Sequence, residues 1–260
     1  MMDTSNPILT ADAVSVYYGK QRGCDGVSLD LYPGEVMGIV GESGSGKSTL
    51  LSALSGRLTP SAGTISYCSR SGDMLNVHKI SEPQRRLLMR TDWAFVHQNP
   101  RDGLRMNVSA GANVGERLMA IGQRHYGEIR GQAIDWLDRV EVDTSRVDDL
   151  PGTYSGGMQQ RLQIARNLVT NPRLVFMDEP TGGLDVSVQA RLLDLIRGLV
   201  TNLGLSAIVV THDLAVVRLL AHRLMVMKQG KVVESGLTDQ VLDDPQHPYT
   251  QLLVSSILRT

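Results

Sequence analysis

One eight-residue motif constrains the fold of this chain more than any other feature. Gly41, Lys47 and Ser48 stand at the spacing GxxxxGK[ST], directly after the apolar run 35–40 and directly before the helix-forming residues 49–51. Glycines let the backbone turn its N–H groups toward phosphate oxygens, and the helix that follows directs its positive end to the same place. The motif therefore predicts a phosphate-binding loop between a buried strand and a helix, in an α/β nucleotide-binding fold.

Each polar residue of this loop has an expected task. Lys47 reaches the terminal phosphates, and the Ser48 hydroxyl is a ligand for Mg²⁺. The alternative is a Gly/Ser linker with an unrelated lysine, which the strand and helix signals on either side disfavour. The predicted nucleotide-binding residues here are Gly41, Glu42, Ser43, Gly44, Ser45, Gly46, Lys47, Ser48 and Thr49.

Two adjacent acids end a second apolar run. Residues 174–177 have the pattern of a buried strand, and Asp178 and Glu179 follow at the carboxyl edge, where α/β sheets present residues to ligands. Asp178 is expected to hold Mg²⁺, directly or through water, and Glu179 to polarise the water that attacks the terminal phosphate. The alternative is a strand followed by a solvated acidic turn.

The rest of the chain indicates a mainly parallel sheet with an inserted helical part. Residues 207–210 form another short apolar run, whereas the pattern turns helical over 81–140, starting with a capping box between Ser81 and Gln84. A further helix is expected after Asp185, whose carboxylate can cap it. We expect an antiparallel segment up to about residue 40, then a nucleotide-type core with the helical subdomain inserted in it. This gives one domain over 1–260, with a core of about 1–97 and 156–260 and a helical subdomain of about 98–155, residue 81 being the alternative start.

Composition narrows the class of protein. The chain has 260 residues, 42% of them hydrophobic, and a formal net charge of -1, so a phosphate-contacting nucleic-acid binder is disfavoured. No apolar run approaches the length of a membrane span, and residues 1–6 lack the features of a secretion signal, so we expect a cytoplasmic protein. Cys24 and Cys68 are too few for a zinc module and are expected to be inert thiols.

The motifs occur in an order that resembles the ATP-binding-cassette (ABC) ATPases. The phosphate loop is followed by Gln98, a Ser-Gly-Gly signature, the acidic pair, a Gly-Leu-Asp turn and His212. The resemblance spans almost the whole chain and implies an ABC fold: a RecA-like parallel-sheet core, an antiparallel β subdomain and an inserted helical subdomain. It also implies ATP and Mg²⁺ as cofactors and hydrolysis of ATP to ADP and phosphate.

The resemblance assigns further roles. Tyr18 is placed where the family stacks an aromatic ring on adenine, with Tyr17 as the rival and core packing as the alternative. Gln98 would contact Mg²⁺ and the attacking water, unless it is a solvated loop residue. His212 would contact the terminal phosphate and orient Glu179, with helix capping as its structural alternative.

The family also forms head-to-tail dimers. The resemblance implies that Ser155, Gly156 and Gly157 complete the phosphate site of a second ABC subunit and that Asp185 lies near the seam. The usual signature is LSGGQ, and this chain departs from it at Tyr154 and Met158. Ser155 also has the position of a helix cap, for a helix expected to begin near Gly157. The phosphate contact is expected to survive, because the serine and both glycines remain.

Shorter segments bear on the partner. Residues 247–253 resemble the ending of oligopeptide and dipeptide importer ATPases, but the chain stops at Thr260 without the cysteine-containing tail of those proteins. Residues 102–105, 113–120 and 124–127 closely resemble the cassette subunit of the bacterial carbon-phosphorus lyase system for phosphonate breakdown. That resemblance implies docking on soluble lyase core subunits through the helical insertion. The alternative is the motor of a peptide-type or phosphonate importer, with separate membrane subunits.

Overall fold

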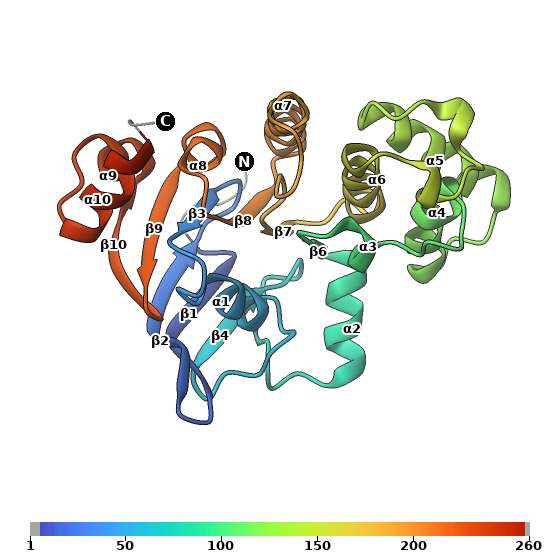
Figure 1. Ribbon diagram of the computed structural model, residues 1–260. Coiled ribbons are helices and arrows are strands. Elements are labelled where there is room, and N and C mark those ends of the chain that lie inside the picture. The colour runs from blue at the N-terminus through green and yellow to red at the C-terminus, as the bar shows by residue number, and fades with distance from the viewer. Residues whose placement is uncertain (1–5, 258–260) are drawn as a thin grey trace. The chain divides into compact units, whose positions relative to one another are not determined.

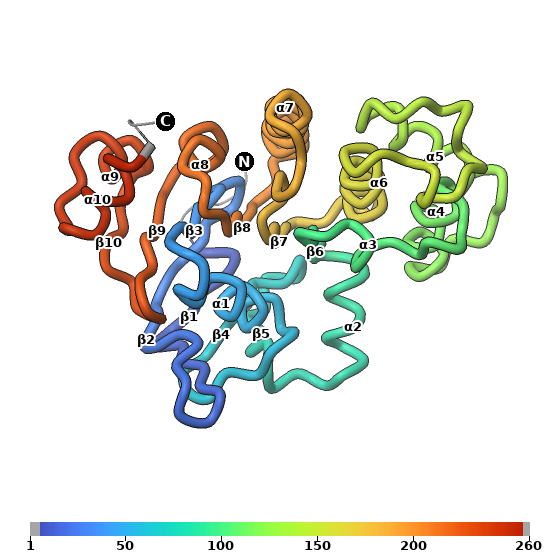
Figure 2. Tube along the Cα trace, viewed as in Figure 1, coloured from blue at the N-terminus to red at the C-terminus, as the bar shows by residue number. Residues whose placement is uncertain are grey.

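The computed structural model describes residues 6–257 and divides the chain into two compact units. Unit 1 contains the residues up to 85 and those from 204 onward, and unit 2 contains residues 86–203. The beginning and the end of the chain thus belong to the same unit, coloured blue and red respectively (Figure 1, Figure 2). Residues 1–5, which form most of the segment used for the expectation of no secretion signal, and the chain end at Thr260 lie outside the described residues.

Unit 1 contains an antiparallel sheet with the strand order β2-β1-β4-β5. The antiparallel segment expected before residue 40 is confirmed by β1 and β2. The later strands β4 and β5 were not predicted, although Ile65 and Tyr67 of β4 alternate with less buried neighbours. The bounds are β1 (Leu9–Tyr18), β2 (Gln21–Leu31), β4 (Ala62–Cys68) and β5 (Met74–Asn76).

A second group of strands in unit 1 is mainly parallel. Strand β3 (Val36–Val40) pairs in parallel with β8 (Ser206–Thr211) and β9 (Arg223–Lys228), and β10 (Lys231–Leu237) runs antiparallel to β9. Every residue of β3 and β8 is buried, as expected of parallel strands covered on both faces. This is why continuous apolar runs marked both strands in the sequence. The helices of unit 1 are α1 (Lys47–Leu54), α8 (Leu214–Leu220), α9 (Thr238–Asp243) and α10 (Pro248–Ile257).

Unit 2 is mostly helical and contains two parallel strands. Strands β6 (Trp93–Val96) and β7 (Leu174–Asp178) pair, and the rings of Trp93 and Phe176 meet edge to face with centroids 5.6 Å apart. Helices α4, α5 and α6 pack together beside them (Figure 1). The remaining elements are α3 (Pro100–Gly103), α4 (Ala110–Ala120), α5 (Tyr126–Arg139), two 3-10 helices (Thr144–Arg146 and Pro151–Thr153), α6 (Gly156–Leu168) and α7 (Val186–Leu203).

The helix predictions hold, with one exception. Helix α2 (Glu82–Thr91) begins with the predicted capping box: the Ser81 N–H donates to Gln84 Oε1 at 3.0 Å and the Gln84 N–H to Ser81 Oγ at 3.4 Å. Helix α7 begins directly after Asp185, as predicted. The helical pattern over 81–140 was wrong at residues 93–96, which form β6, because a four-residue apolar run is too short to show a period.

Two further structural observations concern the length of the helices and the two cysteines. Within residues 6–257, no helix is long and apolar enough to cross a membrane. Cys24 and Cys68 are both free, and burial raises the pKa of the Cys24 thiol. A thiol with a raised pKa stays protonated at neutral pH and is therefore a poor nucleophile.

Candidate active site

The predicted phosphate loop wraps around the side chain of Lys47. This lysine is buried, and its Nζ donates to Gly41 O at 2.7 Å and to Glu42 O at 2.9 Å. The Ser45 Oγ is buried as well and has no hydrogen-bond partner among the described residues. A buried hydroxyl without a hydrogen-bond partner costs free energy of folding. A loop of this kind therefore fits an anionic group that would accept a hydrogen bond from the hydroxyl.

Two glycines of the loop are required by close backbone approach. Gly46 has φ +101°, and a Cβ atom there would lie 2.0 Å from Gly23 O. A Cβ atom at Gly41 would lie 2.2 Å from Met227 O. Since no side chain fits at either position, the loop can keep this path only with glycine. Helix α1 starts directly after Gly46, which confirms the predicted strand, loop and helix.

His212 reaches the same edge of unit 1 as the phosphate loop. Strands β3 and β8 run in parallel with Val40 opposite Thr211, so Gly41 and His212 follow at the same end. The helix-capping alternative for His212 is wrong. The cap of α8 is Asp213, whose carboxylate accepts from the Ala215 N–H at 2.8 Å.

The structure separates the two candidate aromatic residues. The Tyr17 hydroxyl donates to Asp25 Oδ1 at 2.6 Å, a hydrogen bond that raises the pKa of Tyr17 and lowers the pKa of Asp25. Tyr18 is 52% exposed, which contradicts the core-packing alternative. A Cβ atom at Gly23 would touch both the Tyr18 ring, at 3.1 Å, and the Thr49 methyl group, at 2.7 Å. Tyr18 thus lies near the first turn of α1 and is about half exposed.

In unit 2, the parallel pairing of β6 and β7 brings three predicted residues to one edge. Val96 is opposite Met177, so Gln98 lies at the same strand ends as Asp178 and Glu179. Glu179 has φ +46°, a left-handed conformation that is uncommon for residues other than glycine. Backbone strain of this kind costs on the order of 1–3 kcal/mol and concentrates at functional positions. The strained backbone here is that of Glu179, whose carboxylate is predicted to polarise the attacking water.

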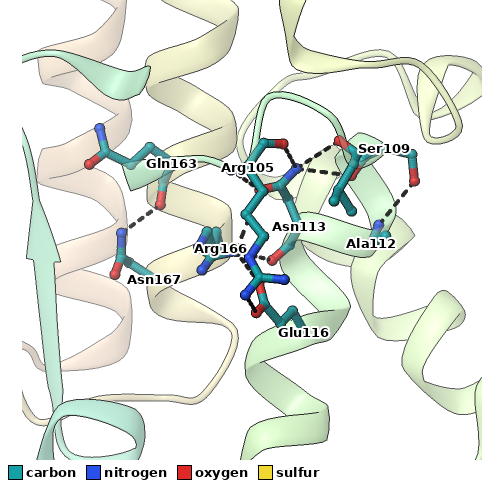
Figure 3. Close-up of polar contacts among 9 residues, drawn as sticks. Arg105, Ser109, Ala112, Asn113, Glu116, Gln163, Arg166 and Asn167 are labelled. Carbon is teal, nitrogen blue, oxygen red and sulfur yellow. Dashed lines mark hydrogen bonds and ion pairs between the residues drawn. The ribbon is translucent and has the colours of Figure 1, made fainter. Parts of the chain in front are cut away.

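A group of buried amides on α6 holds this edge in place, and sequence analysis missed it. Gln160 Nε2 donates to His97 O at 3.2 Å and to Pro180 O at 2.9 Å. Gln163 accepts from the His97 N–H at 2.6 Å and donates back to His97 O at 3.1 Å. These contacts fix the backbone of His97, which precedes Gln98, and the carbonyl of Pro180, which follows Glu179. The signal in the sequence is the polar spacing of Gln160, Gln163 and Asn167 on one face of a helix, the last two joined in Figure 3.

The Ser-Gly-Gly signature opens α6. Ser155 caps the helix and accepts from the Met158 N–H at 3.3 Å, so the predicted cap is confirmed, with the helix starting one residue earlier than expected, at Gly156. The family's leucine is replaced by Tyr154, which is buried and donates to Arg146 O at 2.8 Å. This substitution therefore affects packing inside unit 2, while Ser155 and Gly156 stay exposed.

An open pocket of about 360 Å³ brings several of these segments together within unit 2. Asp185 is exposed and directly follows the last lining residue. The pocket thus joins the Gln98 segment, the signature and the turn before α7. Its lining residues are Gln98, Asn99, Pro100, Gly156, Gln159, Gln160, Gly182, Gly183 and Leu184.

The donor set suits Mg²⁺ rather than a transition metal. Within residues 6–257, no group of three or more His, Cys, Asp or Glu side chains could form a metal cage. Magnesium requires no such cage, because it binds through one or two protein oxygens together with substrate phosphates and water. The residues predicted to bind Mg²⁺, which are Ser48, Gln98 and Asp178, carry oxygen atoms of that kind.

Comparisons with known proteins agree with these features. A family model described as ABC transporter matches residues 24–182, and one described as Oligopeptide/dipeptide transporter, C-terminal region, matches residues 233–260. The chain is 65% identical to the putative phosphonates utilization ATP-binding protein PhnK of Escherichia coli (strain K12), over 98% of this chain and 99% of that protein. It is 37% identical to the dipeptide transport ATP-binding protein DppF of the same organism, over 97% of this chain and 77% of that protein.

A solved structure shows the same fold. The ATP-binding cassette MJ0796, a dimer in a post-hydrolysis state bound to ADP and Pi, superposes with a TM-score of 0.79 at 28% sequence identity. The match covers 88% of this chain and 98% of that one. The chain therefore belongs to the ABC family, as an ATP-binding and ATP-hydrolysing cassette with an α/β P-loop fold.

Proposed function

We propose that this protein is the ATPase subunit of a bacterial phosphonate-degrading system and docks on a soluble carbon-phosphorus lyase core. The observation that carries the proposal is the 65% identity, over nearly the full length of both chains, to a protein named for phosphonate utilization. Cleavage of the carbon-phosphorus bond belongs to other subunits, since this chain has only two cysteines and no iron-sulfur ligand set. The protein's part is to couple ATP hydrolysis to a change in the core.

The site residues act on ATP in complementary ways. Lys47 and the N–H groups of the phosphate loop bind the phosphates, and Tyr18 stacks on adenine. Glu179 accepts a proton from a water molecule while the water oxygen attacks the terminal phosphorus of ATP. The bond between this phosphorus and the bridging oxygen breaks, giving ADP and phosphate. His212 orients Glu179 and contacts the terminal phosphate. Mg²⁺, held by Ser48, Gln98 and Asp178, would neutralise charge on the phosphates.

Two copies, or this chain and a related cassette, form the working dimer. The solved cassette MJ0796 is dimeric. The start of the signature in this chain is suited to the same use, because Ser155 and Gly156 are exposed at the beginning of α6, whereas Gly157 is buried. Ser155, Gly156 and Gly157 would complete the phosphate site of the second subunit, with Asp185 at the seam. In this proposal the whole chain is one ABC domain, in which residues of about 98–155 form the helical subdomain.

Two of the segments that resemble the carbon-phosphorus lyase cassette, 102–105 and 113–120, form one hydrogen-bonded cluster in unit 2 (Figure 3). Asn113 is fully buried; it accepts from the Arg105 N–H at 2.8 Å and donates to Arg105 O at 3.0 Å. Glu116 pairs with Arg105 and with Arg166, each at 2.9 Å. Arg166 belongs to α6, so segments 102–105 and 113–120 are attached to the helix that the signature opens.

The same region has an exposed apolar surface suited to docking. Met119 and Ile121, at the end of α4, are exposed, and Tyr126, at the start of α5, is 73% exposed. Exposed aromatic residues and methionines are enriched in protein interfaces. A core subunit bound here would contact the end of α4. Asn113 and Glu116 of the same helix bind Arg105 and Arg166.

The first test is isolation of the tagged protein from its own cells with ATP and Mg²⁺, followed by mass spectrometry of what accompanies it. We expect stoichiometric soluble lyase subunits. Tyr126→Asp should abolish this association and leave ATPase activity of the isolated protein unchanged, whereas the matched control Tyr32→Asp in unit 1 should retain it. Recovery of membrane permease subunits alone would contradict the lyase assignment.

The alternative function is that of an importer ATPase, which recovery of membrane permease subunits would support. Residues 233–260 match the C-terminal region of oligopeptide and dipeptide transporters, and a dipeptide transport protein is 37% identical to this chain. An importer ATPase would use the same ATP site with separate membrane subunits. The two functions therefore differ in the partner and share the chemistry.

Tyr18→Ala is expected to weaken ATP binding by about tenfold, because stacking of an aromatic ring on a base contributes about 1–3 kcal/mol. Tyr17→Phe, which removes only the hydroxyl bonded to Asp25, should change ATP affinity by less than threefold. Titration with a fluorescent ATP analogue measures both. A larger loss for Tyr17→Phe than for Tyr18→Ala would reverse the assignment.

A further inference from the structure

The C-terminal His-Pro-Tyr segment reaches the phosphate loop, a contact that the motifs do not indicate. Tyr249 is 4% exposed and lies in α10, the last helix of unit 1. The Glu42 N–H, in the first turn of the loop, donates to Tyr249 Oη at 3.0 Å. The two residues are 207 positions apart in the sequence. The end of the chain thus contacts the backbone on which the predicted phosphate site is built.

The Gly41–Glu42 peptide is held from both sides. Its carbonyl, Gly41 O, accepts from Lys47 Nζ at 2.7 Å, and its N–H donates to Tyr249 Oη. Gly41 also packs against Met227 O so closely that no Cβ atom would fit. One peptide plane therefore links the tyrosine hydroxyl to an acceptor of the lysine that is expected to bind phosphate. If this plane rotates, the lysine loses an acceptor that fixes its position.

The segment before α10 sets the position of Tyr249. Glu234, on β10, accepts from the Gln246 N–H at 2.8 Å and from the His247 N–H at 3.0 Å. The His247 ring accepts from the Tyr249 N–H at 3.1 Å, and Pro248 starts the helix, where its missing N–H costs nothing. Each residue of the His-Pro-Tyr segment thus has a separate structural part, and Tyr249 is the one that contacts the loop.

Packing fixes the tyrosine ring as well. Tyr249 belongs to a buried cluster with Val40, the last residue before the loop, and Val226, and Leu253 of α10 packs against this cluster. Lys228 Nζ lies 4.6 Å from the centre of the Tyr249 ring. Packing therefore keeps the ring beside Glu42, and the hydrogen bond from its N–H to Tyr249 Oη orients the Gly41–Glu42 peptide.

We propose that Tyr249 is a positioning residue for the phosphate loop: its hydroxyl fixes the Gly41–Glu42 peptide and thereby the place of Lys47. The inference rests on the proposed function insofar as it takes this loop to bind the phosphates of ATP. It makes α10 a part of the nucleotide site, although no residue of this helix needs to touch the nucleotide.

The test compares Tyr249→Phe with Leu253→Ala in the full-length protein, using calorimetric titration with ADP and Mg²⁺. Tyr249→Phe keeps the ring and leaves the Glu42 N–H without its acceptor, so we expect the Kd for ADP to rise about fivefold. KM for ATP should rise in parallel, and kcat should stay within twofold because the residues that act on water are unchanged. Leu253→Ala removes packing only; it should lower Tm and leave both Kd and KM within twofold.

A backbone signal separates positioning from general stability. Hydrogen exchange of the Glu42 amide, followed by NMR, should be slow in the wild-type protein and in Leu253→Ala, and fast in Tyr249→Phe. A Kd within twofold of wild type for Tyr249→Phe would overturn the inference, and so would an equal loss in Leu253→Ala. If Tyr249→Phe does not fold, rapid exchange of the Glu42 amide in the wild-type protein would overturn it by itself.

Lys47→Ala distinguishes a failure of the inference from a failure of the proposed function. If Lys47→Ala weakens ADP binding and Tyr249→Phe does not, only the positioning role of Tyr249 is lost. If neither variant changes ADP affinity, the loop is not the phosphate site, and the proposed function falls with the inference.

Discussion

Glu179→Gln is expected to lower the rate of ATP hydrolysis by at least about 100-fold, while ATP binding remains within threefold of wild type. The substitution keeps the size and the polarity of the side chain but removes the carboxylate that accepts a proton from the attacking water, and general base catalysis of this kind contributes about 10²–10⁴-fold. Steady-state phosphate release measures turnover, and calorimetry measures binding. Turnover close to that of the wild-type protein would remove Glu179 from the catalytic role.

The same variant should accumulate an ATP-bound dimer, because closure no longer leads to hydrolysis. Light scattering with and without ATP and Mg²⁺ measures the change in mass. Adding Ser155→Arg to Glu179→Gln should prevent the dimer, since a bulky cation replaces the small exposed residue at the start of α6. If the double variant binds ATP with wild-type affinity and still forms the dimer, this would contradict the proposal that the signature completes the phosphate site of the second subunit.

Lys47→Ala is expected to raise the Kd for ADP by about 30-fold or more. The change removes a buried ammonium group that the loop surrounds, and hydrogen bonds from a charged donor to phosphate contribute about 1.5–3 kcal/mol each. Calorimetric titration checks the affinity, and thermal unfolding checks that the variant is folded. Lys79→Ala, which removes an exposed lysine of the same unit, is the matched control and should leave the Kd unchanged.

Unchanged affinity for ADP in a folded Lys47→Ala protein would contradict the phosphate-loop assignment. It would also exclude the explanation offered for the unpartnered Ser45 hydroxyl, which lies buried in the same loop. The two predictions are independent, because Lys47 acts on binding and Glu179 on the chemical step. A protein that fails one of them and meets the other would still have its remaining assignment intact.

Most elements near the site could be predicted, because their signals are local. The strand, loop and helix around Lys47 follow from glycine spacing and an apolar run, and the capping of α6 by Ser155 follows from a single polar residue before two glycines. Strand β6 was missed, since its four residues are too few to show a period. The sequence left Tyr17 as a rival to Tyr18 for stacking on adenine, because two adjacent tyrosines look alike in a sequence. The structure distinguishes them, since the Tyr17 hydroxyl donates to Asp25.

The sequence by itself determined which chemical groups the protein has: a phosphate loop, an acidic strand end, a signature and a histidine after a buried strand. Those motifs are short and contiguous, so their spacing is sufficient to identify them. The tertiary structure alone decided how they are held. Gln160 and Gln163 of α6 fix the backbone beside Gln98 and Glu179, and Tyr249 binds the peptide next to Lys47. Contacts between residues far apart in the chain depend on how the elements pack, and no local pattern of residues specifies them.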